Sequence, residues 1–290
     1  MRRALAFSIV LKAALSASGA SAETLKVAVA QRGFWNSSFI EFGIRQGFFK
    51  ETGLDIDILY TEGGASTLTP VIAGSIDIAM TNGTLGAIAA YAKGMPVKII
   101  SAEATGAPDA FWYARPESGI TTLADTAGRT VAFSSPGSST NLILLQLIQQ
   151  AKVTPKMVAT GGAPGTLTQV MSRQIDVGWS VPPFVLQQLA DGKLAIIAKG
   201  SDAAAIANQT IRVNVANANA LKERRDAITR FVKVLARSID WAYSDDRSIE
   251  TYAEMIVMGR HGEPDLQKMR LAEERFEAEA AGRVEMEELA

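Results

Sequence analysis

The apolar positions of this chain follow two alternating patterns, short β-prone runs and longer stretches with helical spacing. In the first half they predict strands at about 24–30, 55–60, 76–80 and 97–101, with helices at 37–50, 65–74 and 83–93. In the second half they predict strands at about 130–133, 156–159, 175–178 and 194–198, with helices at 139–151, 165–173 and 182–191. Strands that alternate with helices of this length predict the α/β class, with parallel sheets covered on both faces.

The two halves also repeat each other in sequence. Residues 67–81 read TLTPVIAGSIDIAMT and residues 166–180 read TLTQVMSRQIDVGWS, 99 positions further along. Both copies are entered through Gly-Gly-Ala, within TEGGAS and TGGAPG. A repeat at this spacing is too long for a solenoid unit and suits a duplicated lobe. We therefore expect two α/β lobes of related design.

The remaining segments have no counterpart in the repeat. A strand-like run, TIRVNVA, covers 210–216, and helices are predicted at about 219–243, 246–259 and 264–288. The simplest path leaves lobe one near 103–109, builds lobe two and returns near 201–209. This gives residues 23–106 and 207–290 to lobe one and residues 107–206 to lobe two. Two crossings form a two-strand hinge on which the lobes could close.

The first 22 residues have the layout of a secretory signal peptide. Arg2 and Arg3 precede the apolar run ALAFSIVL, and Ala20-Ser21-Ala22 form a small-residue cleavage signal. We expect cleavage after Ala22 and an exported, soluble protein, because no other apolar run approaches the roughly 18–20 residues that span a bilayer.

Composition excludes several chemistries. Among 290 residues there is no cysteine and one histidine, His261, so disulfides, thiolate catalysis and histidine-based metal sites or triads are not expected. The formal net charge is -1 with acids and bases mixed, which favours neither nucleic acid nor an anionic membrane. No cofactor is expected, and the chain is expected to be a monomer.

Candidate ligand residues gather where predicted strands end and helices begin. In open α/β sheets these ends face the binding crevice, and helix N-termini there favour anions. The corresponding loops are 31–36, 81–84, 134–140 and 179–182. The candidate ligand-binding residues within or near them are Arg32, Phe34, Trp35, Asn36, Asn82, Gly83, Trp112, Ser134, Ser135, Ser138, Ser139, Thr140 and Trp179.

Some of these residues have an equally good structural interpretation. Ser138 or Ser139 could only cap the following helix, and Trp112 and Trp179 could be core residues. Asp77 and Asp176, in the paired Ile-Asp motifs, are expected to fix the turn from helix to strand rather than to touch a ligand.

Several motifs together resemble a known family. They are KVAVAQRGFW, FFKETGLDIDI, EGGAST, GSIDIAMTNGTLGAIAAYAKGMPVKII, LADTAGRTVAFSSPGSSTN and RQIDVGWSVPP, and the resemblance spans about residues 24–245. They are similar to periplasmic solute-binding proteins of nitrate/sulfonate/taurine-type ABC importers, the group related to thiamine-pyrimidine-precursor binders. The resemblance implies a type II periplasmic-binding-protein fold and delivery of a small solute to a membrane permease served by a separate ATPase. It also implies a pocket formed by the loops above, with Phe111 and Trp112 on the hinge side.

Two questions of function stay open at this point. The fold group also contains enzymes, namely pyrimidine synthases and a cysteine-dependent desulfinase, but this chain lacks cysteine and Ser138 has no histidine partner to activate it. The ligand could be a small organic anion, such as a sulfonate, taurine-like compound or carboxylate, or a pyrimidine-like heterocycle. Arg32 and the serines favour the anion, whereas the aromatic side chains favour a ring.

Overall fold

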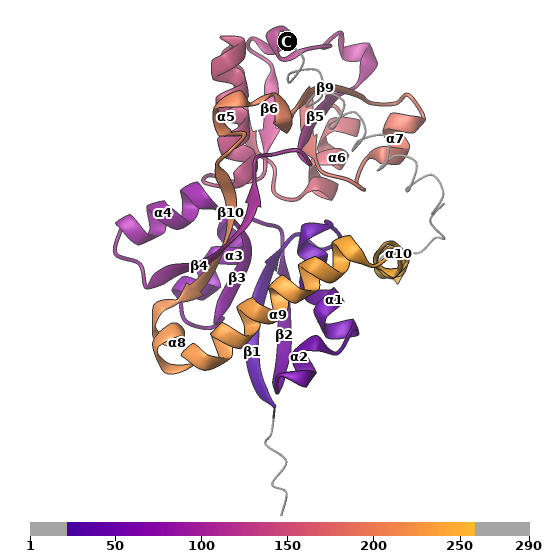
Figure 1. Cartoon of the computed structure of the whole chain (residues 1–290). Helices are drawn as coiled ribbons and strands as arrows, with labels where there is room; N and C mark the ends of the chain where they lie inside the picture. Colours follow the sequence, from indigo (N-terminus) through magenta and orange to yellow (C-terminus); the bar gives the residue numbers. More distant parts are fainter. Residues whose placement is uncertain (1–21, 259–290) are drawn as a thin grey trace, which may run out of the picture.

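The computed structural model describes residues 22–258 and contains two lobes, one above the other in Figure 1. Residues 1–21 of the predicted signal peptide and the predicted helix at 264–288 lie outside the described residues. None of the helices within residues 22–258 combines the length and the apolar character needed to cross a bilayer.

Lobe one is built on a five-stranded sheet with the strand order β2-β1-β3-β10-β4. Its strands are β1 (Glu23–Ala30), β2 (Leu54–Thr61), β3 (Ile78–Gly83), β4 (Val97–Thr105) and β10 (Thr210–Asn217). Apolar residues of α1 (Phe39–Arg45), α2 (Phe48–Glu51), α9 (Arg225–Ser244) and α10 (Arg247–Met258) pack on one face. The other face is covered by α3 (Ala65–Ile72) and α4 (Thr84–Ala92), and α8 (Ala218–Glu223) leads into α9.

Lobe two has its own five-stranded sheet, with the order β7-β6-β8-β5-β9. Its strands are β5 (Phe111–Ala114), β6 (Thr130–Phe133), β7 (Lys156–Ala159), β8 (Val177–Ser180) and β9 (Ala195–Lys199). Its helices are α5 (Ser139–Ala151), α6 (Ala163–Met171) and α7 (Leu186–Ala190). One large apolar cluster, which includes Trp112 and Trp179, forms its core.

The sheets are mixed, whereas the sequence pattern predicted parallel ones. Strand β10 runs antiparallel to β3 and β4, and β5 runs antiparallel to β8 and β9. Both exceptions have the same cause. Each of these strands enters its sheet after a crossing from the other lobe, so it starts at the end where the neighbouring strands finish. Strand β5 itself was not predicted, because FWYA is short and shows no alternation of polar and apolar residues.

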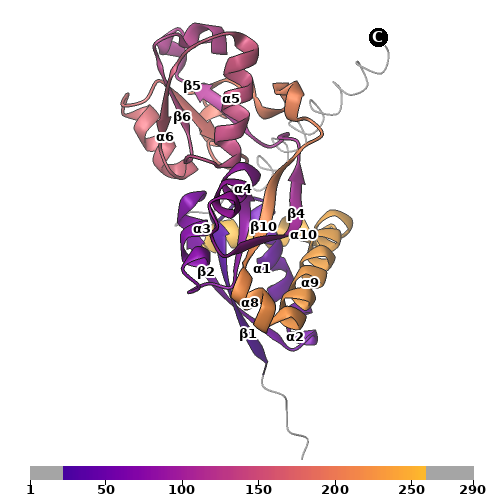
Figure 2. The same cartoon turned by 90° about the vertical axis from the view of Figure 1, so that its left-hand side faces the viewer.

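The chain crosses between the lobes twice, at the ends of β4 and β10. These two strands lie side by side and lead from lobe one toward lobe two (Figure 2). Next to them, the Gly106 amide donates to the Gln209 carbonyl at 2.9 Å, which holds the two crossings together. The two lobes and the two-strand hinge expected from the sequence are therefore present.

Two predicted helices are divided in the structure. The segment 37–50 is a short 3-10 turn, Asn36–Ser38, followed by α1 and α2, because Gly47 takes a left-handed conformation (φ 75) between the two helices. The segment 219–243 is α8 and α9, and the predicted helix at 182–191 begins only at Leu186. The other elements predicted within residues 22–258 are present, with bounds shifted by a few residues.

Candidate ligand-binding cleft

A cavity of about 40 Å³ lies between the two lobes and is lined by residues of both. Lobe one contributes Gln31 and Phe34 after β1, Glu62 after β2, and Thr81 near the end of β3. The carboxyl ends of parallel strands meet at one edge of a sheet, so these side chains converge there. One water molecule needs roughly 10–15 Å³ of such space, so the cavity admits a small polar group.

The lobe two wall is the segment that opens helix α5. Ser138 is the N-cap of this helix, and its hydroxyl accepts from the Asn141 amide at 3.2 Å. The Thr140 hydroxyl accepts from the Ser134 amide at 2.9 Å and lies 3.0 Å from the Ser138 hydroxyl. These bonds fold the segment so that four hydroxyl residues, Ser134, Ser138, Ser139 and Thr140, line the cavity together.

Arg212 joins the two lobes at the cavity. It lies in β10, is only 6% exposed, and lines the cavity. Its two terminal nitrogens donate to Asp109 at 2.6 and 3.2 Å, and its Nε donates to the Ser139 hydroxyl at 3.2 Å. Burial lowers the pKa of Arg212, but Asp109 and Glu103 outweigh burial and leave that pKa above its ordinary value. The guanidinium therefore stays charged and is fixed in place at the lobe boundary.

A second polar group lies beside Arg212. Glu103 of β4 accepts from the Thr81 amide at 2.8 Å and from the Asn36 side chain at 3.1 Å. Burial raises the pKa of Glu103, while Arg212 and these hydrogen bonds oppose the rise. Thr81 takes a left-handed conformation (φ 61), which is strained for a β-branched residue. Such strain is found preferentially at functional sites, and here it points the Thr81 amide at Glu103.

Two buried polar atoms of the cavity lining have no hydrogen-bond partner within residues 22–258. They are the Thr81 hydroxyl and the Trp179 indole nitrogen. Leaving a buried donor unpaired costs about 1–3 kcal/mol, so such atoms are rare in folded proteins. A bound solute with hydrogen-bonding groups would satisfy them.

Aromatic rings form the apolar part of the lining. Phe34 of lobe one meets Trp179 of lobe two edge to face, with ring centroids 6.3 Å apart. Phe34 also contacts Phe184 of lobe two at 5.3 Å between centroids. The cavity thus combines a charged and hydroxyl-rich part with a small aromatic part.

Several sequence candidates do line the cavity. They are Phe34, Gly83, Ser134, Ser138, Ser139, Thr140 and Trp179. Ser135 lies next to it at the lobe boundary, where its hydroxyl accepts from the Ala65 amide at 3.4 Å.

The structure does not bring Arg32 to the cavity. Its side chain is 55% exposed on the outside of lobe one, where it pairs with Glu41 at 3.6 Å and lies over the Tyr60 ring at 5.0 Å. The sequence placed it correctly in the loop after β1 but could not show the direction of its side chain. Gln31 and Phe34, in the same loop, face the cavity instead.

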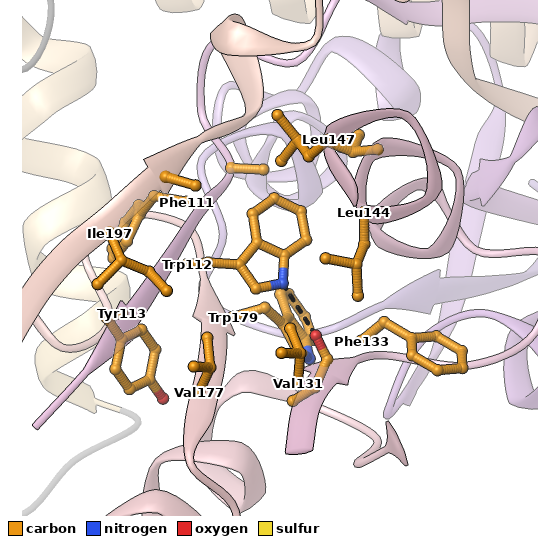
Figure 3. Close-up of a cluster of buried hydrophobic side chains, with 14 of the residues drawn as sticks. Phe111, Trp112, Tyr113, Val131, Phe133, Leu144, Leu147, Val177, Trp179 and Ile197 are labelled. Atoms are coloured by element: carbon orange, nitrogen blue, oxygen red, sulfur yellow. Dashed lines mark hydrogen bonds between the residues drawn. The ribbon is translucent and has the colours of Figure 1, made fainter. Parts of the chain in front are cut away.

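The remaining candidates do not line the cavity and make other contacts. Trp112 is fully buried in lobe two among Phe111, Leu144 and Leu147, and its indole nitrogen donates to the Ala132 carbonyl at 2.9 Å (Figure 3). Trp35 packs against the rings of lobe one, with Tyr252 5.0 Å away between centroids. The list is completed by Asn36, which supports Glu103, and Asn82, whose side chain donates to the Met80 carbonyl.

Sequence reasoning missed Arg212 and Glu62 as cavity residues. Arg212 sits within TIRVNVA, a strand without a counterpart in the repeat, so the comparison of the two halves gave no signal for it. Glu62 stands in TEGGAS, directly after a predicted strand, and that position was the available signal. Within the described residues, no cluster of His, Cys, Asp or Glu could hold a metal ion.

The family model described as NMT1/THI5 like matches residues 35–248 of the chain. The chain belongs to this NMT1/THI5-like family. The match includes both crossings and the whole cavity lining except Ala30, Gln31 and Phe34. It confirms the family relationship suggested by the sequence motifs. No curated protein sequence matches the chain.

Solved structures with the same fold include three solute-binding proteins. The alkanesulfonate-binding protein SsuA of Xanthomonas axonopodis pv. citri, bound to MOPS, has a TM-score of 0.72 and 18% identity, with 86% of this chain and 82% of that one covered. The periplasmic aliphatic sulphonate binding protein SsuA of Escherichia coli has a TM-score of 0.64 and 18% identity, with 90% of this chain and 93% of that one covered. The periplasmic nitrate-binding protein NrtA of Synechocystis PCC 6803 has a TM-score of 0.68 and 12% identity, with 81% of this chain and 65% of that one covered. The NMT1/THI5-like chain therefore has the type II periplasmic-binding-protein fold.

Proposed function

We propose that this NMT1/THI5-like protein is the substrate-binding component of an ABC import system. It would capture a small solute with an anionic group, such as a sulfonate, a taurine-like compound or a carboxylate, between its two lobes. The observation that carries the proposal is the inter-lobe cavity, where Arg212, Ser139 and two unpaired polar atoms converge. The names of the structural neighbours, which are sulfonate- and nitrate-binding proteins, support an anionic solute.

The proposal includes partners and location. The loaded protein would deliver its solute to permease subunits served by a separate ATPase, and it would act as a monomer in the periplasm after removal of residues 1–22. Residues 23–106 and 207–290 would form lobe one and residues 107–206 lobe two, so that the hinge lies at the two crossings.

A second candidate ligand is a pyrimidine-like heterocycle. The edge-to-face pair of Phe34 and Trp179 supports it, since a flat ring could pack against these faces for about 0.5–1.5 kcal/mol per pair. Catalysis is disfavoured, because the chain has no cysteine and the hydroxyl of Ser138 is occupied in capping α5.

Native mass spectrometry of the protein after incubation with a metabolite extract tests the proposal. We expect one solute per chain, released with its mass unchanged. Arg212→Gln should lose the adduct, whereas Arg32→Gln, which changes an arginine outside the cavity, should retain it. Release of a chemically altered compound would contradict the binding role, and equal retention by both variants would show that the solute does not bind in this cavity.

A further inference from the structure

Two charged side chains, Glu62 and Arg212, line the cavity among the residues the structure describes. They stand at opposite sides of it. Glu62 directly follows β2, and Arg212 lies near the start of β10, at the same edge of a sheet ordered β2-β1-β3-β10-β4. Three strand spacings separate their backbones, roughly 14 Å. The cavity thus has one negative and one positive side.

The positive side already has its counter-ion. Asp109 holds both terminal nitrogens of Arg212, and Glu103 adds a carboxyl group close by. An anion entering the cavity would therefore meet a guanidinium that Asp109 already neutralises, together with the carboxylate of Glu62. Like charges in a confined site repel, so an anion that carried no positive group would be disfavoured there.

The negative side presents two side-chain acceptor oxygens, one from Glu62 and one from Gln31. A Cβ added at Gly162 of lobe two would lie 2.4 Å from Glu62 Oε2 and 2.2 Å from Gln31 Oε1, so both oxygens gather at this point of the lobe boundary. Gln31 Oε1 accepts from the Ala163 amide at 3.3 Å, and Glu62 makes no ion pair within the described part of the chain. A group of carboxylate and amide oxygens suits an ammonium donor.

We propose that the cavity selects a zwitterion, a compact solute with an anionic group and an amino group a few bonds apart. The anionic group faces Arg212 and the Ser139 hydroxyl, and the ammonium group faces Glu62 and Gln31. Glu62 and Arg212 are then the residues that determine specificity. This inference rests on the proposed solute-binding function, because it specifies the ligand of the same cavity.

Calorimetric titration with two matched pairs of probes tests the inference. The pairs are 2-aminoethanesulfonate against ethanesulfonate, and 3-aminopropanoate against propanoate. In at least one pair the zwitterion should bind about tenfold or more tightly than its partner without the amino group. Glu62→Gln should reduce that preference to about threefold or less, because it removes the charge and keeps the shape. Glu223→Gln, at an exposed site in α8 outside the cavity, should leave the preference unchanged.

Other outcomes overturn the inference. Equal or tighter binding of the probe without an amino group would do so, as would failure of all four probes to bind. If Glu62→Gln weakened the binding of both members of a pair equally, Glu62 would contribute to lobe closure and would not recognise the amino group of the solute. A solute without a positive group, recovered unchanged by native mass spectrometry, would leave the binding function intact and reject only the zwitterion. If no solute were retained, both proposals would fail.

Discussion

The amide of Gly86 in lobe one donates to the carbonyl of Gly137 in lobe two at 3.0 Å, so the two lobes meet backbone to backbone. Three residues earlier, a Cβ added at Gly83 would lie 2.3 Å from the same carbonyl oxygen. Contact this close requires the absence of side chains at the lobe boundary. The glycines beside the cavity therefore permit closure of the cleft.

Gly83→Ala should hold the lobes apart. Gly83 has φ -59, which alanine adopts freely, so the substitution should leave each lobe stable and obstruct only their contact. Affinity for the solute should fall about tenfold or more, because the closed form becomes less populated. Small-angle scattering should show a larger radius of gyration in the presence of solute. Gly165→Ala is the control, since its Cβ would meet nothing closer than 3.8 Å. If Gly83→Ala with solute had the same radius of gyration as the wild type, the closure argument would be wrong.

Substitution of Trp112 should lower stability strongly, whereas substitution of Arg32 should hardly change it. This differs from the sequence-based expectation that both residues bind the ligand. Trp112→Ala removes a fully buried side chain from the core of lobe two and should cost about 3–5 kcal/mol of unfolding free energy. Arg32→Ala removes an exposed side chain and should change stability by about 0.5 kcal/mol or less. Urea unfolding measures both values. A small loss for Trp112→Ala would mean that its ring is not part of the core.

The internal repeat predicted two lobes of the same design, and the two lobes do share equivalent hydrogen bonds at equivalent positions of the repeat. Asp77 accepts from the Lys26 amide and Asp176 from the Thr130 amide, each at 2.8 Å. These contacts tie the turn before β3 to β1 and the turn before β8 to β6. Polar residues that fix a turn in this way leave a local sequence signal, and both were correctly interpreted as structural.

The cleft was predictable only in part. The hydroxyl-rich start of α5 and the strand ends are local features, and they do line the cavity. The direction of a loop side chain is not local: Arg32 turns outward because Glu41 and Tyr60 bind it there. Arg212 reaches the cleft only because β10 returns from the other lobe and brings it opposite Asp109, 103 residues away in sequence. Such a juxtaposition depends on tertiary structure and leaves no pattern in the sequence.

Glu103 should make stability depend on pH. Because burial raises the pKa of Glu103 above its ordinary value of 4.5, the folded protein binds this proton more tightly than the unfolded chain does. The resulting stabilisation is fully present below pH 4.5 and is lost as the pH rises through the folded-state pKa. Glu103→Gln cannot titrate, so the wild type should lose stability relative to this variant as the pH rises from 4.5 through the folded-state pKa. Urea unfolding across that range measures the difference, and a constant difference would show that Glu103 does not titrate there.

Thr81→Val should separate binding from stability. The Thr81 hydroxyl has no partner within residues 22–258, and valine keeps the β-branched shape at this strained position. Stability without solute should therefore stay the same or rise, because an unpaired buried polar group is removed. Affinity for the recovered solute should fall by about 0.5–1.5 kcal/mol, roughly two- to tenfold, if the hydroxyl bonds to it.

Thr166→Val is the matched control in the other lobe, since the Thr166 hydroxyl lies 2.6 Å from that of Thr160 and donates to the Gly162 carbonyl at 2.9 Å. It should lose about 1–3 kcal/mol of stability. Unchanged affinity in Thr81→Val would show that the Thr81 hydroxyl has no role in binding. Equal destabilisation of both variants would show that this hydroxyl is hydrogen-bonded in the protein without solute.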